Sequence, residues 1–222
     1  MVSGGVSSGE HGGETRRLVV GISGASGTIY GIRLLEVLRD TPMETHLVMT
    51  EAAKRVAESE TGYTAAQVEA LADVVYGSDE IDAPISSGSF ITAGMIVAPC
   101  SIKSLSAIAH SYDDTLLVRA ADVVLKERRR LVLMVRETPL HLGHLRLMAE
   151  VTESGAVVLP PVPSFYNQPA TIADIVDQTV GKMLDQFGLE CHLFKRWPDG
   201  RRSSGPPGAA FSGQGGQAPP RG

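Results

Sequence analysis

The segment Leu18-Val-Val-Gly-Ile-Ser-Gly-Ala-Ser-Gly27 joins a short apolar run to a glycine-rich turn. The run from Leu18 to Ile22 suits a buried strand, and the glycines after it permit tight turning. Downstream, apolar residues recur at every third position from Ile29 to Leu38, which predicts a helix that stops near Pro42. A strand, a turn and a helix in this order are typical of one unit of a parallel α/β sheet.

The same alternation continues along the chain. Further strands are predicted at residues 47–49, 95–98, 131–135 and 156–159. Helical patterns follow from Thr50 through Val56, around Leu105 and Ile108, over 142–148 before Gly155, and after the capping signal Thr171-Ile-Ala-Asp174. In the last helix, which Gly188 is expected to close, the residues predicted to face inward are Ile172, Ile175, Val176, Val180, Met183 and Leu184. We therefore expect an α/β fold, a doubly wound parallel sheet in a single domain with helices on both faces.

Composition limits the classes of function. Residues 1–15 are Gly/Ser-rich and residues 199–222 are Gly/Pro-rich, so both are expected to be disordered around a domain at 16–198. A net charge of −5 gives no excess of positive charge that would attract a nucleic acid. No apolar run is long enough to span a membrane, and the N-terminus lacks the apolar core of a secretory signal. Two isolated cysteines fit a reducing compartment, so we expect a cytoplasmic protein.

Ligands of doubly wound sheets bind outside the carboxyl ends of the strands, which directs attention to loops 23–28, 50–51, 99–104 and 136–139. At the first loop, backbone N–H groups at a helix start attract phosphate, and Ser26 adds a hydroxyl. The spacing is not G-x-G-x-x-G, and Thr50 stands where a dinucleotide site has an acidic residue. A mononucleotide such as FMN is therefore favoured.

Two further segments carry polar side chains. Pro99-Cys-Ser-Ile-Lys-Ser104 offers hydroxyls and a cation for phosphate or flavin, although N-capping by Ser101 explains the local pattern equally well. Cys100 is expected to pack rather than to act as a nucleophile, because no His or Asn is placed to form a dyad with it. In Arg119-Ala-Ala-Asp-Val-Val-Leu-Lys126, the spacing puts Arg119, Asp122 and Lys126 on one helix face, which alone would fit a solvated surface.

Six motifs in order resemble the UbiX family of flavin prenyltransferases. They are Gly24-Ala-Ser-Gly27, Ser86-Ser-Gly-Ser-Phe90, Pro99-Cys-Ser101, Arg119 to Arg129, Arg136-Glu-Thr-Pro139 and Pro163-Ser-Phe-Tyr-Asn-Gln-Pro169, and the resemblance covers roughly residues 16–197. It implies a Rossmann-like flavoprotein fold, usually in a dodecamer. It also implies that reduced FMN and dimethylallyl monophosphate react, without a metal, to give prenylated FMN for UbiD-type decarboxylases. The new bonds come from flavin N5 and C6.

The resemblance also implies roles for individual residues. Family FMN contacts fall on Gly24, Ala25, Ser26, Thr50, Ser101, Ile102, Lys103, Ser104 and Arg136. Prenyl-phosphate contacts fall on Arg119, Lys126, Tyr166 and Lys182, where Lys182 replaces an arginine of many members. The residues expected to be catalytic are Ser26, Glu60, Lys126 and Glu137, with Glu137 relaying a proton through Ser26.

Plainer interpretations remain open. Tyr166 would then cap a loop, Lys182 would lie on a solvated face with Gln178 and Asp185, and Glu60 would be a surface carboxylate. For the whole chain, the alternatives are a flavin-dependent cysteine decarboxylase of related fold and a non-catalytic flavin carrier. A cysteine decarboxylase relies on an active-site His, and this chain has no His in the first turn. A flavin carrier has to bind only one FMN phosphate, which needs fewer cations than this chain offers.

Overall fold

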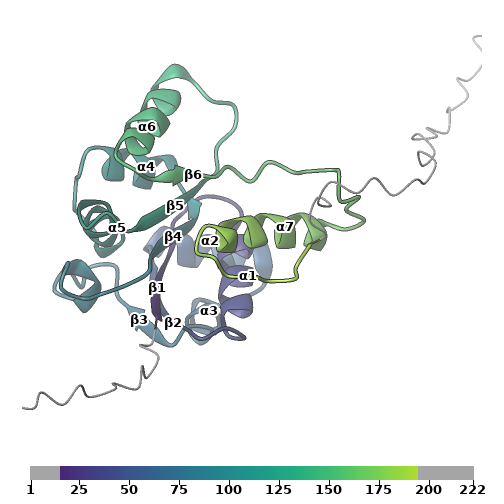
Figure 1. The fold of residues 1–222 in the computed structure, drawn as a ribbon, viewed down its shortest axis with the longest axis horizontal. Coiled ribbons are helices and arrows are strands. Elements are labelled where there is room, and N and C mark those ends of the chain that lie inside the picture. Colours follow the sequence, from purple (N-terminus) through teal and green to yellow (C-terminus); the bar gives the residue numbers. More distant parts are fainter. Residues whose placement is uncertain (1–15, 195–222) are drawn as a thin grey trace, which may run out of the picture.

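The computed structural model describes residues 16–194, whose core is a six-stranded, all-parallel sheet (Figure 1). Its order is β3-β2-β1-β4-β5-β6. The strands are β1 (Arg16–Ile22), β2 (Met43–Met49), β3 (Val74–Tyr76), β4 (Gly94–Cys100), β5 (Arg130–Val135) and β6 (Val157–Val158). The predictions for residues 1–15, 195–198 and 199–222 lie outside the described residues.

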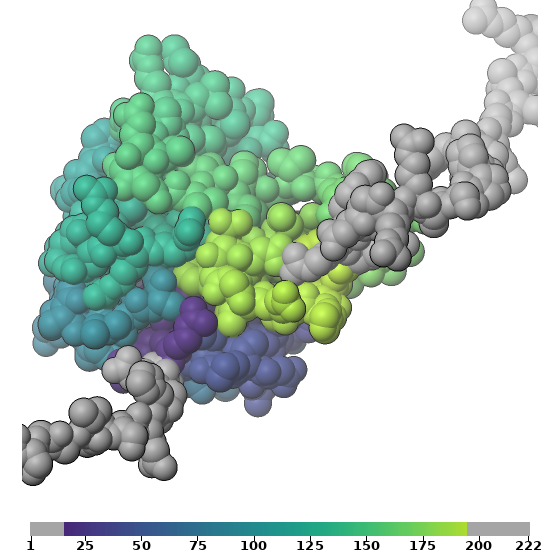
Figure 2. Space-filling model, viewed as in Figure 1, coloured from purple at the N-terminus to yellow at the C-terminus, as the bar shows by residue number. Residues whose placement is uncertain are grey.

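Helices cover both faces of the sheet. They are α1 (Thr28–Leu38), α2 (Glu51–Thr61), α3 (Ala65–Glu69), α4 (Ile102–Ala109), α5 (Leu116–Lys126), α6 (Leu142–Glu153) and α7 (Ile172–Asp185), with a 3₁₀ turn at η1 (Pro84–Ser86). One core cluster lies under α1, α2, α3 and α7, and the other lies under α4, α5 and α6. In Figure 2, α7 and the residues after it (yellow-green) cover the middle of the face in view.

Successive residues of a central strand point to opposite faces of the sheet and so belong to different core clusters. Leu18 and Val20 of β1 belong to the first cluster, whereas Val19 between them belongs to the second. Both faces of such a strand exclude water, so its sequence is continuously apolar instead of alternating. The predicted doubly wound parallel sheet is confirmed.

The strand order creates a crevice beside β1. The chain winds from β1 through β2 to β3 on one side and then crosses to β4 on the other side. The loops after β1 and β4 therefore diverge, and ligands of this fold class bind at that switch point.

Three details differ from the expectations. Strand β3 was not predicted, because an edge strand of three half-buried or exposed residues has no long apolar run. Ile172 was expected to face inward but is 80% exposed, because it is the first residue of α7 and precedes the part of the helix that covers the core. Leu142 and Leu145 mark α6 as predicted, yet they are 60% and 50% exposed.

Candidate active site

A cavity of about 450 Å³ lies at the switch point. This volume is in the range of small-molecule sites. Among its lining residues are five that were predicted to bind the cofactor, namely Gly24, Thr50, Ser101, Lys103 and Ser104. The others are Glu51, Ala52, Arg55, Ser78, Ala107, Asp114, Thr115 and Val118. Three of the four predicted loops contribute lining residues, because the cavity opens onto the ends of β1, β2 and β4. Loop 136–139 contributes none.

Ser23 joins the two loops that flank the crevice. Its hydroxyl donates to the Pro99 carbonyl at 2.9 Å and accepts from the Ser101 N–H at 2.7 Å, and its side chain is fully buried. A buried hydroxyl with both roles satisfied holds the ends of β1 and β4 in register. Ser23 was not predicted as a site residue, because a serine in a glycine-rich turn has no distinctive local signal.

Two predicted hydroxyls act as helix caps. Thr50 accepts from the Ala53 N–H at 3.1 Å, and Ser101 accepts from the Ser104 N–H at 3.2 Å. N-capping by Ser101, one of the two interpretations left open, is thus present. It leaves other N–H groups at the start of α4 available to a ligand in the cavity.

The glycine-rich turn binds a carboxylate of the protein itself. Gly27, with φ of 96°, is the N-cap of α1, and its N–H donates to Glu60 Oε2 at 2.8 Å. Glu60 comes from the end of α2. The helix start was expected to offer free N–H groups to a phosphate, and Glu60 occupies the one from Gly27. The same turn needs Gly24 for packing, because a Cβ atom there would lie 2.4 Å from the Ala52 methyl.

Glu60 joins Ser26 and Arg136 electrostatically. Partial burial has the largest single effect and raises the pKa of the Glu60 carboxyl, whereas hydrogen bonds from the Ser26 side chain and the Gly27 N–H lower it. The Thr28 N–H and the charge of Arg136 act in the same direction, so the pKa lies below its ordinary value of 4.5. Glu60 is therefore ionised at neutral pH.

Glu137 is placed differently. Its carboxylate accepts from the Thr138 N–H at 2.9 Å, in an exposed loop after β5. The carboxylate hydrogen-bonded to Ser26 is Glu60. A proton relay from Glu137 through Ser26 stays a prediction for the substrate-bound state.

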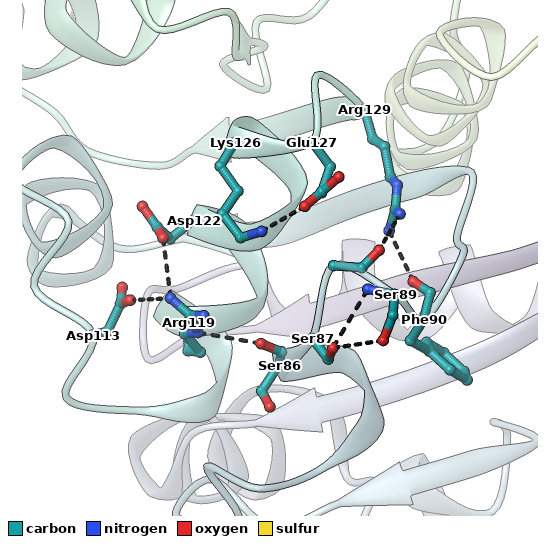
Figure 3. Close-up of polar contacts among 11 residues, drawn as sticks. Ser86, Ser87, Ser89, Phe90, Asp113, Arg119, Asp122, Lys126, Glu127 and Arg129 are labelled. Carbon is teal, nitrogen blue, oxygen red and sulfur yellow. Dashed lines mark hydrogen bonds and ion pairs between the residues drawn. The ribbon is translucent and has the colours of Figure 1, made fainter.

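Neither Arg119 nor Lys126 lines the cavity, and Figure 3 shows their polar partners. Arg119 forms ion pairs with Asp113 at 3.0 Å and Asp122 at 3.3 Å, and Lys126 pairs with Glu127. Helix α5 runs from the cavity, which Thr115 lines, toward the start of β5. Thr115 and Lys126 are therefore separated by roughly 16 Å along its axis.

Tyr166 and Lys182 do not line the cavity either. Tyr166 is 46% exposed in the segment between β6 and α7, which runs away from the sheet before it returns (Figure 1). Lys182 on α7 pairs with Asp185 at 3.6 Å. Gln178, expected on the same solvated face, is only 8% exposed. One chain therefore brings Ser26, Glu60 and Arg136 together but not the four predicted prenyl-phosphate residues.

Cys100 packs in the core. It is fully buried in β4, and burial raises the pKa of its thiol to about 12. The thiol is protonated at neutral pH, which agrees with the predicted packing role. Within residues 16–194, no group of three or more His, Cys, Asp and Glu side chains is arranged to hold a metal ion.

The strand order and the switch-point cavity define a doubly wound nucleotide-binding protein without a dinucleotide fingerprint. The family described as Flavoprotein matches residues 6–185. A flavin prenyltransferase UbiX from Escherichia coli K12 is 61% identical over 185 residues, which cover 82% of this chain and 98% of that protein. The chain belongs to the family of UbiX flavin prenyltransferases.

Solved structures agree with the relatives. AnUbiX, crystallised with FMN and dimethylallyl pyrophosphate, has a TM-score of 0.83 and 52% identity, covering 84% of this chain and 99% of its own. A dodecameric, FMN-dependent UbiX-like decarboxylase from Escherichia coli O157:H7 has a TM-score of 0.81 and 50% identity, covering 82% and 100%. Among the described residues, no helix has the length and apolar character needed to cross a membrane.

Proposed function

We propose that this chain transfers the dimethylallyl group of dimethylallyl monophosphate to reduced FMN. Flavin N5 bonds to the prenyl carbon as the bond from that carbon to the phosphate oxygen breaks, and a bond from flavin C6 closes a fourth ring. The products are inorganic phosphate and prenylated FMN, which a UbiD-type decarboxylase receives. The observation that carries the proposal is the switch-point cavity, because family-matched residues from three separate loops converge on it.

FMN occupies this cavity in the proposal. Lys103 and the N–H groups at the start of α4 supply positive potential for the phosphate, and Thr50 and Ser104 lie on the same wall. The remaining matched contacts, Ala25, Ile102 and Arg136, belong to the loops that border it. The apolar part of the wall, such as Ala107 and Val118, suits the flavin ring.

Ser26 and Glu60 manage protons at the mouth of this site. Glu60 is ionised and accepts from Ser26, so the hydroxyl is oriented and its proton has an acceptor. Arg136 keeps the carboxylate charged. Glu137, next to it in the chain, turns toward Ser26 once both substrates are bound.

The prenyl phosphate is held by cations of neighbouring copies of the chain. None of Arg119, Lys126, Tyr166 and Lys182 lines the cavity of its own protomer, so we assign all four to the site of another protomer. Two observations support such an assembly: the relative from Escherichia coli O157:H7 is dodecameric, and Leu142, Leu145, Val162 and Phe165 leave 50–73% of their surface exposed. Negative charge that develops on the leaving phosphate is stabilised by Arg119, Lys126 and Lys182, and the Tyr166 hydroxyl adds a neutral donor.

The donor and the location belong to the same proposal. We take the monophosphate as the donor, and the diphosphate, with which AnUbiX was crystallised, is the alternative that the test below includes. Within residues 16–194 neither Cys100 nor Cys191 forms a disulfide, in keeping with a cytoplasmic enzyme.

The function is tested by anaerobic incubation of the oligomer with reduced FMN and dimethylallyl monophosphate. We expect one phosphate released per flavin and a flavin whose mass increases by the prenyl group. Oxidised FMN is the control and should release none. Flavin that binds without phosphate release from either the monophosphate or the diphosphate would identify a carrier, and oxidation of a cysteine-ended peptide would identify a cysteine decarboxylase.

A further inference from the structure

The loop from Ser86 to Phe90 is held by arginines of the α5 segment (Figure 3). Arg129 donates through Nη1 to the Phe90 carbonyl at 2.8 Å and through Nη2 to the Gly88 carbonyl at 2.6 Å. Arg119 donates through Nε to the Ser86 carbonyl at 3.3 Å. Three alternate carbonyls are thus bound by two guanidinium groups, and Arg129 provides the two shorter bonds.

A planar guanidinium that spans two carbonyls fixes the direction of the backbone between them. Contacts other than those of Arg129 also hold the loop. The Phe90 ring lies edge-on to His46 at 5.2 Å and under the Arg17 guanidinium at 4.8 Å. The Ser87 and Ser89 hydroxyls pair with each other at 2.8 Å. The segment is therefore a rigid wall, although Ser87 and Ser89 are exposed.

This wall lies directly against Lys126. A Cβ atom built on Gly88 would lie 2.8 Å from Lys126 Nζ and 2.1 Å from Glu127 Oε1. Gly88 has no positive φ, so its backbone conformation does not require a glycine. A side chain at this position would instead collide with Glu127 and Lys126. The position of the Lys126 ammonium therefore depends on where the loop places Gly88.

We propose that Arg129 is a positioning residue for the prenyl-phosphate site. Through the Gly88 and Phe90 carbonyls it holds the loop against Lys126 and so fixes where that ammonium meets the phosphate. Without Arg129 two loop carbonyls lose their partners, the wall relaxes, and the Lys126 ammonium is no longer confined to one position beside Gly88. The inference rests on the proposed role of Lys126 and adds to it a second residue that never touches substrate.

The test compares Arg129→Gln and Arg129→Lys with Arg128→Gln in the assembled enzyme. Arg128 is exposed and adjacent, so its substitution removes the same charge without touching the loop. We expect Arg129→Gln to raise the KM for dimethylallyl monophosphate roughly tenfold, with Arg129→Lys intermediate and Arg128→Gln unchanged. The Kd for FMN and the mass of the oligomer should stay at wild-type values, which a general loss of structure would not allow.

Gly88→Ala keeps the test decisive if Arg129 variants fail to fold. The added methyl meets only the ends of two flexible side chains, so the fold survives while Lys126 moves and the KM rises. An unchanged KM in Gly88→Ala, or in a folded Arg129→Gln, overturns the inference. Equal effects in Arg128→Gln and Arg129→Gln also overturn it.

Lys126→Ala separates this inference from the function on which it rests. A raised KM in Lys126→Ala together with a normal Arg129→Gln enzyme rejects the positioning role alone. A normal KM in Lys126→Ala rejects the phosphate role of Lys126, and the inference falls with it.

Discussion

Glu60 shows how one side chain combines stability with chemistry. It bonds the Gly27 N–H at 2.8 Å across 33 positions of sequence, and thereby ties the end of α2 to the start of α1. A carboxylate at a helix N-terminus is stabilised both by the unsatisfied N–H groups and by the helix dipole. The same charge orients Ser26 beside the cavity.

Glu60→Gln is expected to destabilise the protein only where the carboxylate is ionised. Because the folded-state pKa is lowered, the stabilisation by Glu60 is fully present above the unfolded-state pKa and is lost as the pH falls through the folded-state value. Urea unfolding should therefore show a weaker variant at pH 7 and no difference at strongly acid pH, provided both proteins remain folded there. An equal difference at both values would mean that the ionised carboxylate is not the stabilising form.

Helix α1 approaches the sheet more closely than an ordinary side chain allows. A Cβ atom on Gly31 would lie 2.3 Å from the Ala98 carbonyl oxygen of β4. That oxygen belongs to the backbone of a central strand and cannot move cheaply. The absence of a side chain at Gly31 thus sets the spacing between α1 and the strand that borders the cavity.

We expect Gly31→Ala to lower the free energy of unfolding by about 1–3 kcal/mol, despite the better helix propensity of alanine. Urea denaturation measures this. Ile29→Ala is the control on the same helix, because Ile29 is 37% exposed, and its partial burial should limit the loss of stability to about 1 kcal/mol. A Gly31→Ala protein as stable as wild type would show that α1 can shift without cost.

The whole molecule separates its two sets of predicted site residues. Ser26 and Glu60 lie at the carboxyl edge of the sheet, whereas Lys126 lies near the opposite edge, beside the start of β5. In the proposed reaction a single chain therefore supplies half of a site at each edge. A closed assembly of copies brings unlike halves together.

Mixed oligomers of Ser26→Ala and Lys126→Ala chains should recover activity that neither variant has alone. With random mixing, about a quarter of the sites contain both wild-type residues, so roughly a quarter of wild-type turnover is expected. Co-expression with two affinity tags and phosphate-release assays measure it. Activity no greater than the average of the two pure variants would place both residues in one chain's site.

Local patterns were sufficient for the strand–helix alternation, the glycine turn at Gly24–Gly27 and the capping box at Thr171. Each depends on residues within a few positions of one another, so periodicity and capping chemistry reveal it directly. The cavity-lining residues Thr50, Lys103 and Ser104 followed from the rule that ligands bind at the strand ends. The family resemblance added residues such as Glu60, which no local pattern marks.

Contacts between distant segments were decided by the tertiary structure alone. Glu60 takes the Gly27 N–H, Ser23 bridges to Ser101 across 78 positions, and Arg129 reaches Gly88 across 41. The tertiary structure also decided the exposure of Ile172 and the presence of the short β3, because burial and edge pairing depend on which elements become neighbours. A sequence pattern records what lies near a residue along the chain, whereas these features arise from what the packed sheet brings near it in space.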